Sequence, residues 1–253
     1  MKIYSIIFSP TGGTKKLATL AIDEFAGEKE EISLLDRDKD FSRYQFNTED
    51  LCLIAVPSFG GRVPEVAALR LREMQGNGAK AILLCSYGNR AYEDTLIELK
   101  SIASTAGFRP FAAIAGVSEH SIMHQFASGR PDNRDISEIK DFAKEINRKI
   151  KAEEFSPVVV PGNEKYCEIK LLPFFPEVNE NCSRCGICAR ECPVGAIDPN
   201  RLTETQKDHC IACMRCITVC PFAARFVPEE VLAAAATKMQ EAFKERKKNE
   251  LFL

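Results

Sequence analysis

The chain has 253 residues, enough for two modest domains, and its 34 lysines and arginines nearly balance 36 aspartates and glutamates, which leaves a net charge of −2. This balance produces no large basic field, so nucleic acid is not expected as a partner. The N-terminus leads straight into an apolar strand pattern, with no basic region or long apolar run, so the sequence predicts a cytoplasmic protein without a membrane partner.

The first strand is expected over residues 2–9, and it leads into a loop of hydroxyl groups and glycines that opens a helix. Such a helix N-terminus offers free N–H groups and a favourable dipole to an anion, so the loop predicts a phosphate site. It matches neither a Walker A loop nor a dinucleotide fingerprint. An ordinary turn with a threonine cap is the alternative. The candidate phosphate ligands are Ser9, Thr11, Gly12, Gly13 and Thr14.

Further apolar strands alternate with amphipathic helices along the next hundred residues. This alternation predicts a parallel sheet covered by helices on both faces, the α/β class. Strands are expected at 32–36, 51–58, 79–87 and 111–117, and helices at 64–75, 93–105 and 136–149.

Over about residues 1–152 the chain resembles the flavodoxin family, because Ser9-Pro-Thr-Gly-Gly-Thr14 fits that family's phosphate loop. The resemblance implies a doubly wound, five-stranded parallel sheet of order 2-1-3-4-5, with FMN at the switch point between strands one and three. It also implies that two loops, residues 57–62 and 86–92, hold the flavin ring. Their candidate contacts are Ser58, Phe59, Gly60, Gly61, Ser86, Tyr87, Gly88, Asn89 and Tyr92.

The ring-stacking partner stays open among Phe59, Tyr87 and Tyr92, since the chain has no tryptophan. The two tyrosines are equally compatible with core packing. Two arginines in the same loops, Arg62 and Arg90, either tune the flavin or are surface charges.

The segment after the fifth strand contains two histidines, His120 and His124. We interpret them as ordinary loop residues, with a lid over the flavin as the alternative.

A proline-rich stretch without a helix pattern, residues 156–177, is expected to be a stiff linker. It divides a flavodoxin-like FMN-binding domain, residues 1–155, from a smaller α+β domain at 178–227. A C-terminal amphipathic helix is expected over 228–253, with its apolar stripe packed on its own chain; a dimer contact is the alternative, and the oligomeric state stays open.

Eight of the 11 cysteines form two matching C-x2-C-x2-C-x3-C-P runs. This is the spacing of bacterial [4Fe-4S] ligands, in which the fourth cysteine of each run reaches the other cluster. Zinc sites or disulfides are the alternatives, but the repeat exceeds what either requires. The crossing predicts cluster one at Cys182, Cys185, Cys188 and Cys220, and cluster two at Cys210, Cys213, Cys216 and Cys192.

Residues 178–227 resemble two-cluster bacterial ferredoxins, and the whole chain resembles fused flavodoxin–ferredoxin proteins. The resemblance implies two low-potential [4Fe-4S] clusters and FMN in an electron-transfer flavoprotein of an anaerobic or well-reduced cell. We expect a reductase of a small-molecule electron acceptor or of a redox partner protein. The alternative is a pure electron carrier whose flavodoxin-like half is a docking module. The sequence shows no catalytic acid–base pair or nucleophile.

Overall fold

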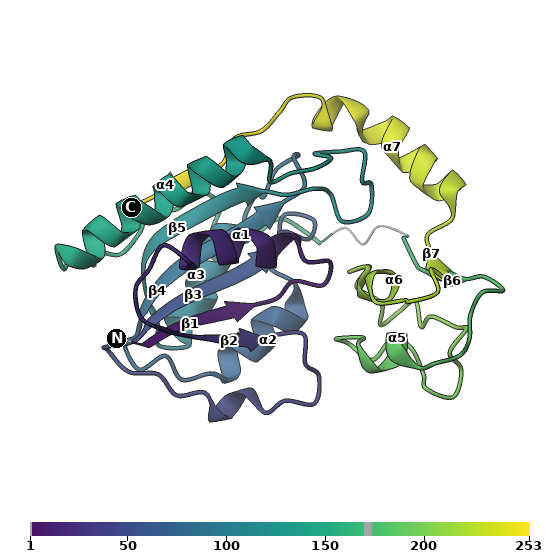
Figure 1. Cartoon of the computed structure of the whole chain (residues 1–253), viewed down its shortest axis with the longest axis horizontal. Helices are drawn as coiled ribbons and strands as arrows, with labels where there is room; N and C mark the ends of the chain where they lie inside the picture. The colour runs from purple at the N-terminus through teal and green to yellow at the C-terminus, as the bar shows by residue number, and fades with distance from the viewer. Residues whose placement is uncertain (1, 170–173) are drawn as a thin grey trace.

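The computed structural model describes residues 2–169 and 174–253 (Figure 1). Its larger part is a six-stranded sheet of order β2-β1-β3-β4-β5-β8. The first five of these strands are parallel and reproduce the 2-1-3-4-5 order, so the predicted flavodoxin-like topology is confirmed. They are β1 (Lys2–Ile7), β2 (Glu28–Ser33), β3 (Leu51–Pro57), β4 (Lys80–Tyr87) and β5 (Arg109–Val117).

Helices cover both faces of this sheet, which is why its central strands are apolar along almost their whole length. Helices α1 (Gly13–Ile22) and α4 (Asn133–Lys151) pack on one face and share its core. Helices α2 (Glu65–Glu73) and α3 (Thr95–Thr105) cover the other, and a short 3-10 turn, η1 (Phe41–Arg43), packs beside α2. This arrangement leaves the carboxyl ends of the parallel strands free to build a site.

The sixth strand was not predicted from the sequence. Helix α7 (Glu229–Phe243) ends ten residues before the expected boundary, and the tail continues as β8 (Glu250–Phe252), antiparallel to β5. A strand of three residues is too short for a recognisable alternation, and its partner lies far away in the sequence. The expected C-terminal helix is therefore a helix followed by an edge strand.

The cysteine-rich region forms a small body with two one-turn helices and a two-stranded ribbon. Helices α5 (Ile187–Arg190) and α6 (Arg215–Thr218) each precede the fourth cysteine of a run, and each follows a residue in the left-handed conformation, Gly186 at φ 76° and Met214 at φ 62°. Strands β6 (Glu177–Val178) and β7 (Arg225–Phe226) pair antiparallel. Figure 1 shows α7 running from this body back toward the sheet.

The first part of the expected linker is attached to the α/β domain. Val158 is fully buried, and its N–H donates to the carbonyl of Pro110 at 3.1 Å. The carboxylate of Asp94 accepts the N–H groups of Asn163 at 2.8 Å and Cys167 at 2.7 Å. Residues 170–173 of the expected linker lie outside the described residues.

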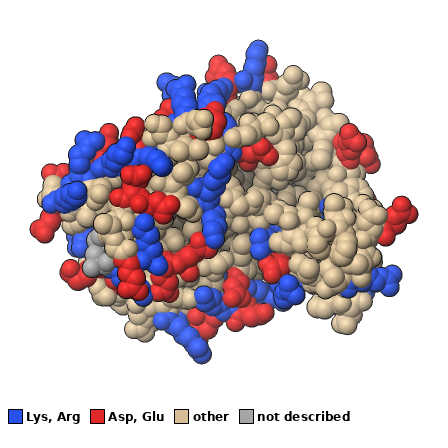
Figure 2. Space-filling model, in the orientation of Figure 1, with Lys and Arg blue, Asp and Glu red and all other residues tan. Residues whose placement is uncertain are grey.

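Basic and acidic side chains are intermixed on the face shown in Figure 2, without a large area of one sign. This distribution agrees with the net charge of −2. Within residues 2–169 and 174–253, none of the helices combines the length and apolar character needed to span a membrane.

Candidate functional site

A cavity opens at the carboxyl ends of the parallel strands, with about 960 Å³ of empty space including its mouth. All three loops that the sequence singled out contribute to it. The loop after β1 supplies Pro10, Thr11, Gly13 and Thr14, the loop after β3 supplies Pro57, Ser58, Phe59 and Gly60, and the end of β4 supplies Ser86, Tyr87 and Gly88.

One end of this cavity is the N-terminus of α1. The N–H groups of Gly13 and Thr14 open the helix, where a helix provides no internal acceptor for them. The hydroxyl groups of Thr14 and Ser86 are hydrogen-bonded at 2.7 Å, which fixes the wall between them. Ser9 and Gly12 do not line the cavity. The Ser9 hydroxyl instead accepts the Lys15 N–H in the first turn of the helix at 2.9 Å.

The aromatic residues of the predicted ring site separate into two groups. Phe59 lines the cavity and packs edge-on against Phe8, with ring centroids 6.5 Å apart. Tyr87 and Tyr92 contact each other instead, and their hydroxyls donate to the Lys248 carbonyl at 2.8 Å and to the Glu250 carboxylate at 2.7 Å. Tyr87 contributes to the cavity wall while Tyr92 lies outside it.

Asn89 and Gly61 also lie outside the cavity and serve packing. The Asn89 side chain donates to the carbonyls of Phe243 and Glu245 in the C-terminal tail. A Cβ atom at Gly61 would overlap the side chain of Glu93, which accounts for the glycine without a flavin. The contacts of Asn89 with the tail were not expected from the sequence, because the tail was predicted to be helical.

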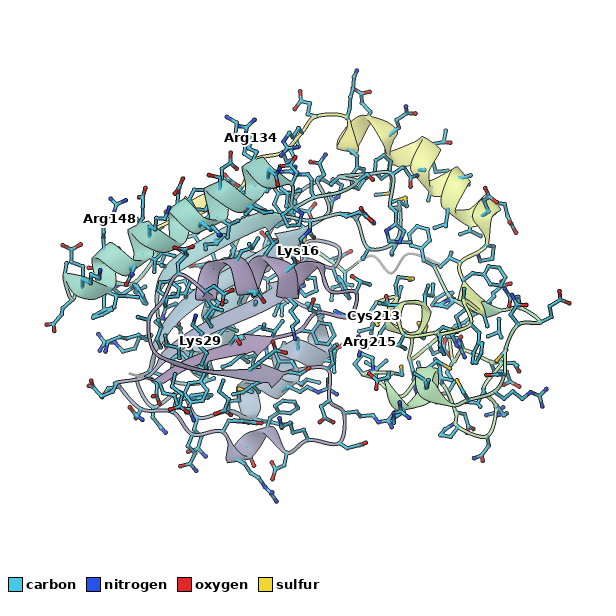
Figure 3. The ribbon with its side chains drawn as sticks, in the orientation of Figure 1. Lys16, Lys29, Arg134, Arg148, Cys213 and Arg215 are labelled. Atoms are coloured by element: carbon cyan, nitrogen blue, oxygen red, sulfur yellow. The ribbon has the colours of Figure 1, made fainter. Side chains whose placement is uncertain are left out.

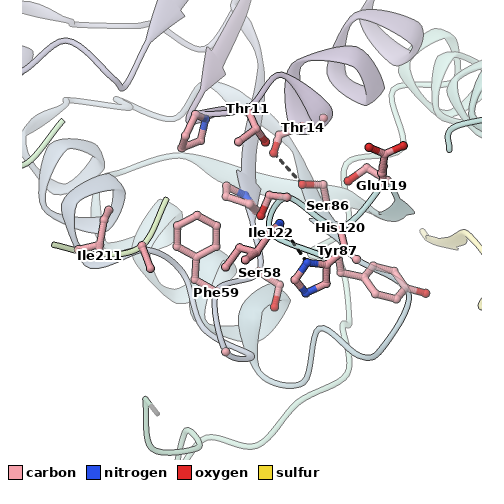
Figure 4. A pocket seen from close by; sticks show the side chains of 18 of the residues that line it. Thr11, Thr14, Ser58, Phe59, Ser86, Tyr87, Glu119, His120, Ile122 and Ile211 are labelled. Carbon is pink, nitrogen blue, oxygen red and sulfur yellow. Dashed lines mark hydrogen bonds between the residues drawn. The ribbon is translucent and has the colours of Figure 1, made fainter. Parts of the chain in front are cut away.

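The segment after β5 forms a wall of the cavity. The interpretation of both its histidines as ordinary loop residues did not anticipate this position. Residues Ser118 to Ile122 line the cavity, and Figure 4 shows His120 and Phe59 at the end away from Thr11 and Thr14. A Cβ atom at Gly88 would lie 2.7 Å from the His120 ring, so this glycine permits close packing of the wall. His124 is exposed and pairs with Glu119.

His120 is held as a neutral imidazole. Its Nδ1 accepts the N–H groups of Ile122 at 3.2 Å and Met123 at 3.1 Å, so the ring proton is carried by Nε2. Burial, with smaller repulsion from His124 and Arg90, lowers the pKa of His120 to about 4. The cavity therefore has one uncharged imidazole N–H donor in its wall at neutral pH.

The two arginines of the ring loops have carboxylate partners and do not line the cavity. Arg62 forms a two-point ion pair with Glu98 at 2.7 and 2.8 Å, and Arg90 forms one with Glu93 at 2.6 and 2.9 Å. The hypothesis that they tune a flavin is not supported by this placement.

Two smaller cavities lie among the eight cysteines of the repeated runs. Cys182, Cys185, Cys188 and Cys220 line the first, with about 340 Å³ of empty space including its mouth, and Cys210, Cys213, Cys216 and Cys192 line the second, with about 330 Å³. These are the groups that the crossing pattern predicts. Among the described residues, no three histidine, cysteine or acidic side chains are close enough to share one metal ion. Each set of four cysteines surrounds its own cavity.

The fourth cysteine of each run accepts the same kind of backbone hydrogen bond. The Sγ atoms of Cys192 and Cys220 accept the N–H groups of Ala196 and Ala224, each at 3.3 Å. Burial raises the pKa of Cys213 and of Cys216 to about 12, so these thiols need a bound metal to become thiolates at neutral pH.

The second cysteine cavity adjoins the large cavity. Ile211 lines both, and its neighbour Ala212 lines the large one. Arg70 of α2 donates to the carbonyl of Pro193 at 2.7 Å, and Arg215 donates to the carbonyl of Pro10 at 3.4 Å, so two hydrogen bonds join the cysteine-rich body to the α/β domain. Figure 3 shows Arg215 and Cys213 on the side that faces the sheet.

Four residues that complete the large cavity were not found from the sequence. Ile169 and Phe174 come from the linker region, and Ile211 and Ala212 come from the cysteine-rich body. Their positions depend on contacts between segments far apart in the chain, for which the sequence gives no periodic signal.

Comparison with known proteins supports the C-terminal assignment. Residues 181–224 match the family described as the 4Fe-4S dicluster domain. No curated protein sequence matches the chain.

Several solved structures are similar to the N-terminal part. A flavodoxin from Streptococcus pneumonia TIGR4 is 16% identical, covers 59% of this chain and 99% of its own, and gives a TM-score of 0.43. Flavodoxin 1 from Bacillus cereus is 17% identical, covers 58% of this chain and 98% of its own, and gives a TM-score of 0.42. A Fusobacterium nucleatum flavodoxin bound to flavin mononucleotide is 13% identical, covers 58% of this chain and 98% of its own, and gives a TM-score of 0.42. Because these scores are low, the fold assignment rests on strand order.

The strand order and the family match thus describe two different parts of one chain. Iron–sulfur clusters ligated by such cysteine runs transfer electrons. The chain is therefore an electron-transfer protein that joins a flavodoxin-like α/β domain to a 4Fe-4S dicluster domain.

Proposed function

We propose that the protein binds two [4Fe-4S] clusters and one FMN and passes electrons between them, in order to reduce a small oxidant or a partner protein. The observation that carries this proposal is the position of Ile211, which lines both the large cavity and the second cysteine cavity. Cluster two would then be separated from the flavin by little more than one side chain. Cluster one would lie on the far side of cluster two.

The cysteine cavities fit the clusters in both the number and the grouping of their sulfurs. Cys182, Cys185, Cys188 and Cys220 would hold cluster one, and Cys210, Cys213, Cys216 and Cys192 would hold cluster two. Each cluster exchanges one electron at a time.

The large cavity fits FMN at both ends. Thr11 and the N–H groups of Gly13 and Thr14 would bind the phosphate, because they stand at a helix N-terminus. Phe59 offers an apolar face, and His120 offers an uncharged N–H donor, to the ring. Bound FMN exchanges electrons singly or in pairs, so it would couple one-electron clusters to a two-electron acceptor. Ile122, Phe174 and Ile211 exclude water from this end.

An outside redox partner would approach cluster one. Cys185 is exposed, and Phe222, which lines the first cysteine cavity, is 50% exposed. None of the residues that fix the dicluster domain to the sheet, Arg70, Pro193, Arg215 and Pro10, lines this cavity.

The first experiment is to measure FMN and iron per chain after purification without air. We expect about one FMN and about eight iron atoms. Eight iron atoms without flavin, even after FMN is added, would favour the alternative of an electron carrier with a docking domain. Steady-state turnover with small acceptors, compared with free FMN, then separates a reductase from a carrier.

The order of the relay is tested by removing one cluster at a time. A reduced bacterial ferredoxin is mixed rapidly with the protein, and reduction of the flavin is followed by absorbance. Cys213→Ala, which removes a ligand of cluster two, should slow flavin reduction at least tenfold. Cys167→Ala is the matched control, because this cysteine lines neither cysteine cavity. Equal rates in the parent protein and Cys213→Ala would contradict the relay.

A further inference from the structure

Two buried side-chain nitrogens lack a hydrogen-bond partner among residues 2–169 and 174–253, and both belong to arginines beside the cysteine cavities. They are the Nε atoms of Arg215 and Arg225. Arg225 lines the cavity of Cys182 and its partners, and Arg215 lines the cavity of Cys213 and its partners. A buried donor without an acceptor is costly, so each Nε–H is expected to face an acceptor that the protein itself does not provide.

The internal repeat shows that neither arginine is needed to build the motif. Arg215 precedes the third cysteine of the second run, where the first run has Ile187. Arg225 follows the fourth cysteine by five residues, where the first run has Ile197. Ile187 and Arg225 therefore line the first cavity, which Arg184 also lines, and Ile197 and Arg215 line the second, which Ile211 also lines.

The two arginines differ in how their charge is balanced. Arg215 forms an ion pair with Glu191 at 2.6 Å, and its side chain is 24% exposed. Arg225 is only 3% exposed, and its other nitrogens donate to neutral oxygens, the Thr205 hydroxyl at 2.9 Å and the Leu202 carbonyl at 2.6 Å. Among the described residues, no carboxylate pairs with Arg225. A buried cation without a counter-ion is strongly unfavourable unless an anion is bound beside it.

We propose that Arg225 donates its Nε–H to a sulfur of cluster one and raises the reduction potential of that cluster above that of cluster two. This inference rests on the proposed function, because it requires both clusters. An iron–sulfur cluster held by four thiolates is an anion, and it gains one further negative charge when it accepts an electron. A nearby positive charge and a hydrogen bond to sulfur therefore favour its reduced state. At cluster two, Glu191 offsets most of the effect of Arg215.

The consequence for function is an order of reduction. Cluster one, on the side open to a partner, is reduced first and holds its electron more tightly. Arg225 also influences cluster two, because its partner Thr205 lines the second cavity. The charge of Arg225 also acts directly on Cys210 and Cys216 of the second group. Because the Arg225 side chain lines only the first cavity, we expect the larger effect at cluster one.

The test measures the two reduction potentials by anaerobic titration, with hyperfine-shifted cysteine β-proton signals to distinguish the clusters. Arg225→Ile restores the residue of the first run and should weaken electron binding by cluster one at least tenfold, about 59 mV for a one-electron couple. Arg225→Lys keeps the charge without the Nε donor and should give a smaller decrease. Arg215→Ile should change the potential of cluster two less than Arg225→Ile changes that of cluster one.

A direct measurement does not depend on these variants folding. The parent protein is produced in cells supplied with arginine that carries ¹⁵N at Nε, and is then reduced. Its pulsed EPR spectrum should show a ¹⁵N coupling at cluster one. Absence of this coupling in protein that holds about eight iron atoms would overturn the proposal. The proposal would also be overturned if the Arg225→Ile protein, with both clusters bound, had an unchanged reduction potential at cluster one. It would be overturned as well if the substitution changed the potential of cluster two more than that of cluster one. If the parent protein does not hold about eight iron atoms, it is the proposed function that fails.

Discussion

The side chain of Asn89 accepts a hydrogen bond from the backbone N–H of Lys247 at 3.0 Å, across 158 positions of sequence. Its amide also donates to the carbonyls of Phe243 and Glu245, and Arg130 donates to its Oδ1 at 3.1 Å. One buried side chain from the loop after β4 therefore holds the turn between α7 and β8.

Asn89→Ala should release the C-terminal tail, because it leaves several backbone groups without partners. We expect a loss of about 2 kcal/mol in the free energy of unfolding. Hydrogen exchange should become faster in residues 244–252 before other regions. The control is Asn200→Ala, since Asn200 is exposed. Unchanged exchange in the tail would show that β8 is held by its backbone pairing with β5 alone.

Asp135 should be among the most sensitive positions of the α/β domain. It is fully buried and binds Arg130 at 2.6 Å, Arg246 at 3.1 Å and Asn249 at 2.9 Å. Asp135→Ala leaves a buried arginine unpaired and should cost about 3 kcal/mol or more. Urea unfolding followed by circular dichroism measures the loss, with Asp141→Ala in an exposed pair as the control.

The pH dependence of this site follows from the ionised state of Asp135. Burial alone would raise the pKa of Asp135, but hydrogen bonds from Arg130, the Asp132 N–H and Asn249 lower it well below its ordinary value. The resulting stability is complete above the pKa of the unfolded carboxyl group, 3.8, and is lost as the pH falls through the lower folded value. We expect no change in this contribution between neutral and mildly acidic pH.

The contribution of His120 to folding stability should change in a different pH range. Its pKa is 6.5 when unperturbed and about 4 in the folded chain, so the unfolded chain takes up a proton first as the pH falls. The stability from neutral His120 is complete above pH 6.5 and is lost as the pH falls from 6.5 toward 4. The thermal unfolding midpoint should fall more between about pH 7 and about pH 5 in the parent protein than in His120→Gln. His124→Gln, at an exposed position, should behave like the parent.

Gly88→Ala should weaken FMN binding at least tenfold. The added methyl group would lie 2.7 Å from the His120 ring and would displace the wall formed by the segment after β5. Gly129→Ala is the comparison, because it strains the backbone at φ 74° but meets no atom within 4 Å. Fluorescence titration with FMN measures both. Equal affinities in the two variants would show that this wall does not contact the flavin.

Removal of iron should unfold the dicluster domain and leave the sheet folded. The apolar core of that domain is small, so ligation of the clusters supplies much of its stability. Its buried members are Ala189, Cys192, Ala196 and Ile197 in one cluster, and Met214 and Val227 in a second cluster with Phe174. Limited proteolysis after chelation should cut within residues 178–227 and preserve a fragment near residues 1–155. Uniform resistance to protease would contradict this expectation.

Local patterns predicted the framework of both domains. The apolar runs of β3, β4 and β5 indicated buried parallel strands, and the order of the sheet was implied by the resemblance to flavodoxins. The cysteine spacing predicted two groups of four, which the structure places around two cavities. Both patterns depend on neighbours a few residues apart.

These local patterns could not predict the contacts between distant segments that complete the site. Ile211 reaches the large cavity only because the dicluster domain folds against the sheet, and Asn89 binds a tail more than 150 residues away. Arg225 could be found from the sequence only in part. Comparison of the two cysteine runs shows an arginine where the first run has Ile197, but only the structure shows that its Nε lacks a hydrogen-bond partner.

The return of the chain to the sheet as β8 attaches the dicluster domain at both ends. Residues 158–167 anchor its start through Asp94 and Pro110, and β8 anchors its end through β5. The dicluster domain therefore lies between two segments that contact the sheet, one before it and one after it in the chain. Transfer within the molecule should therefore proceed at the same rate however dilute the protein is, whereas exchange with an outside partner should depend on concentration.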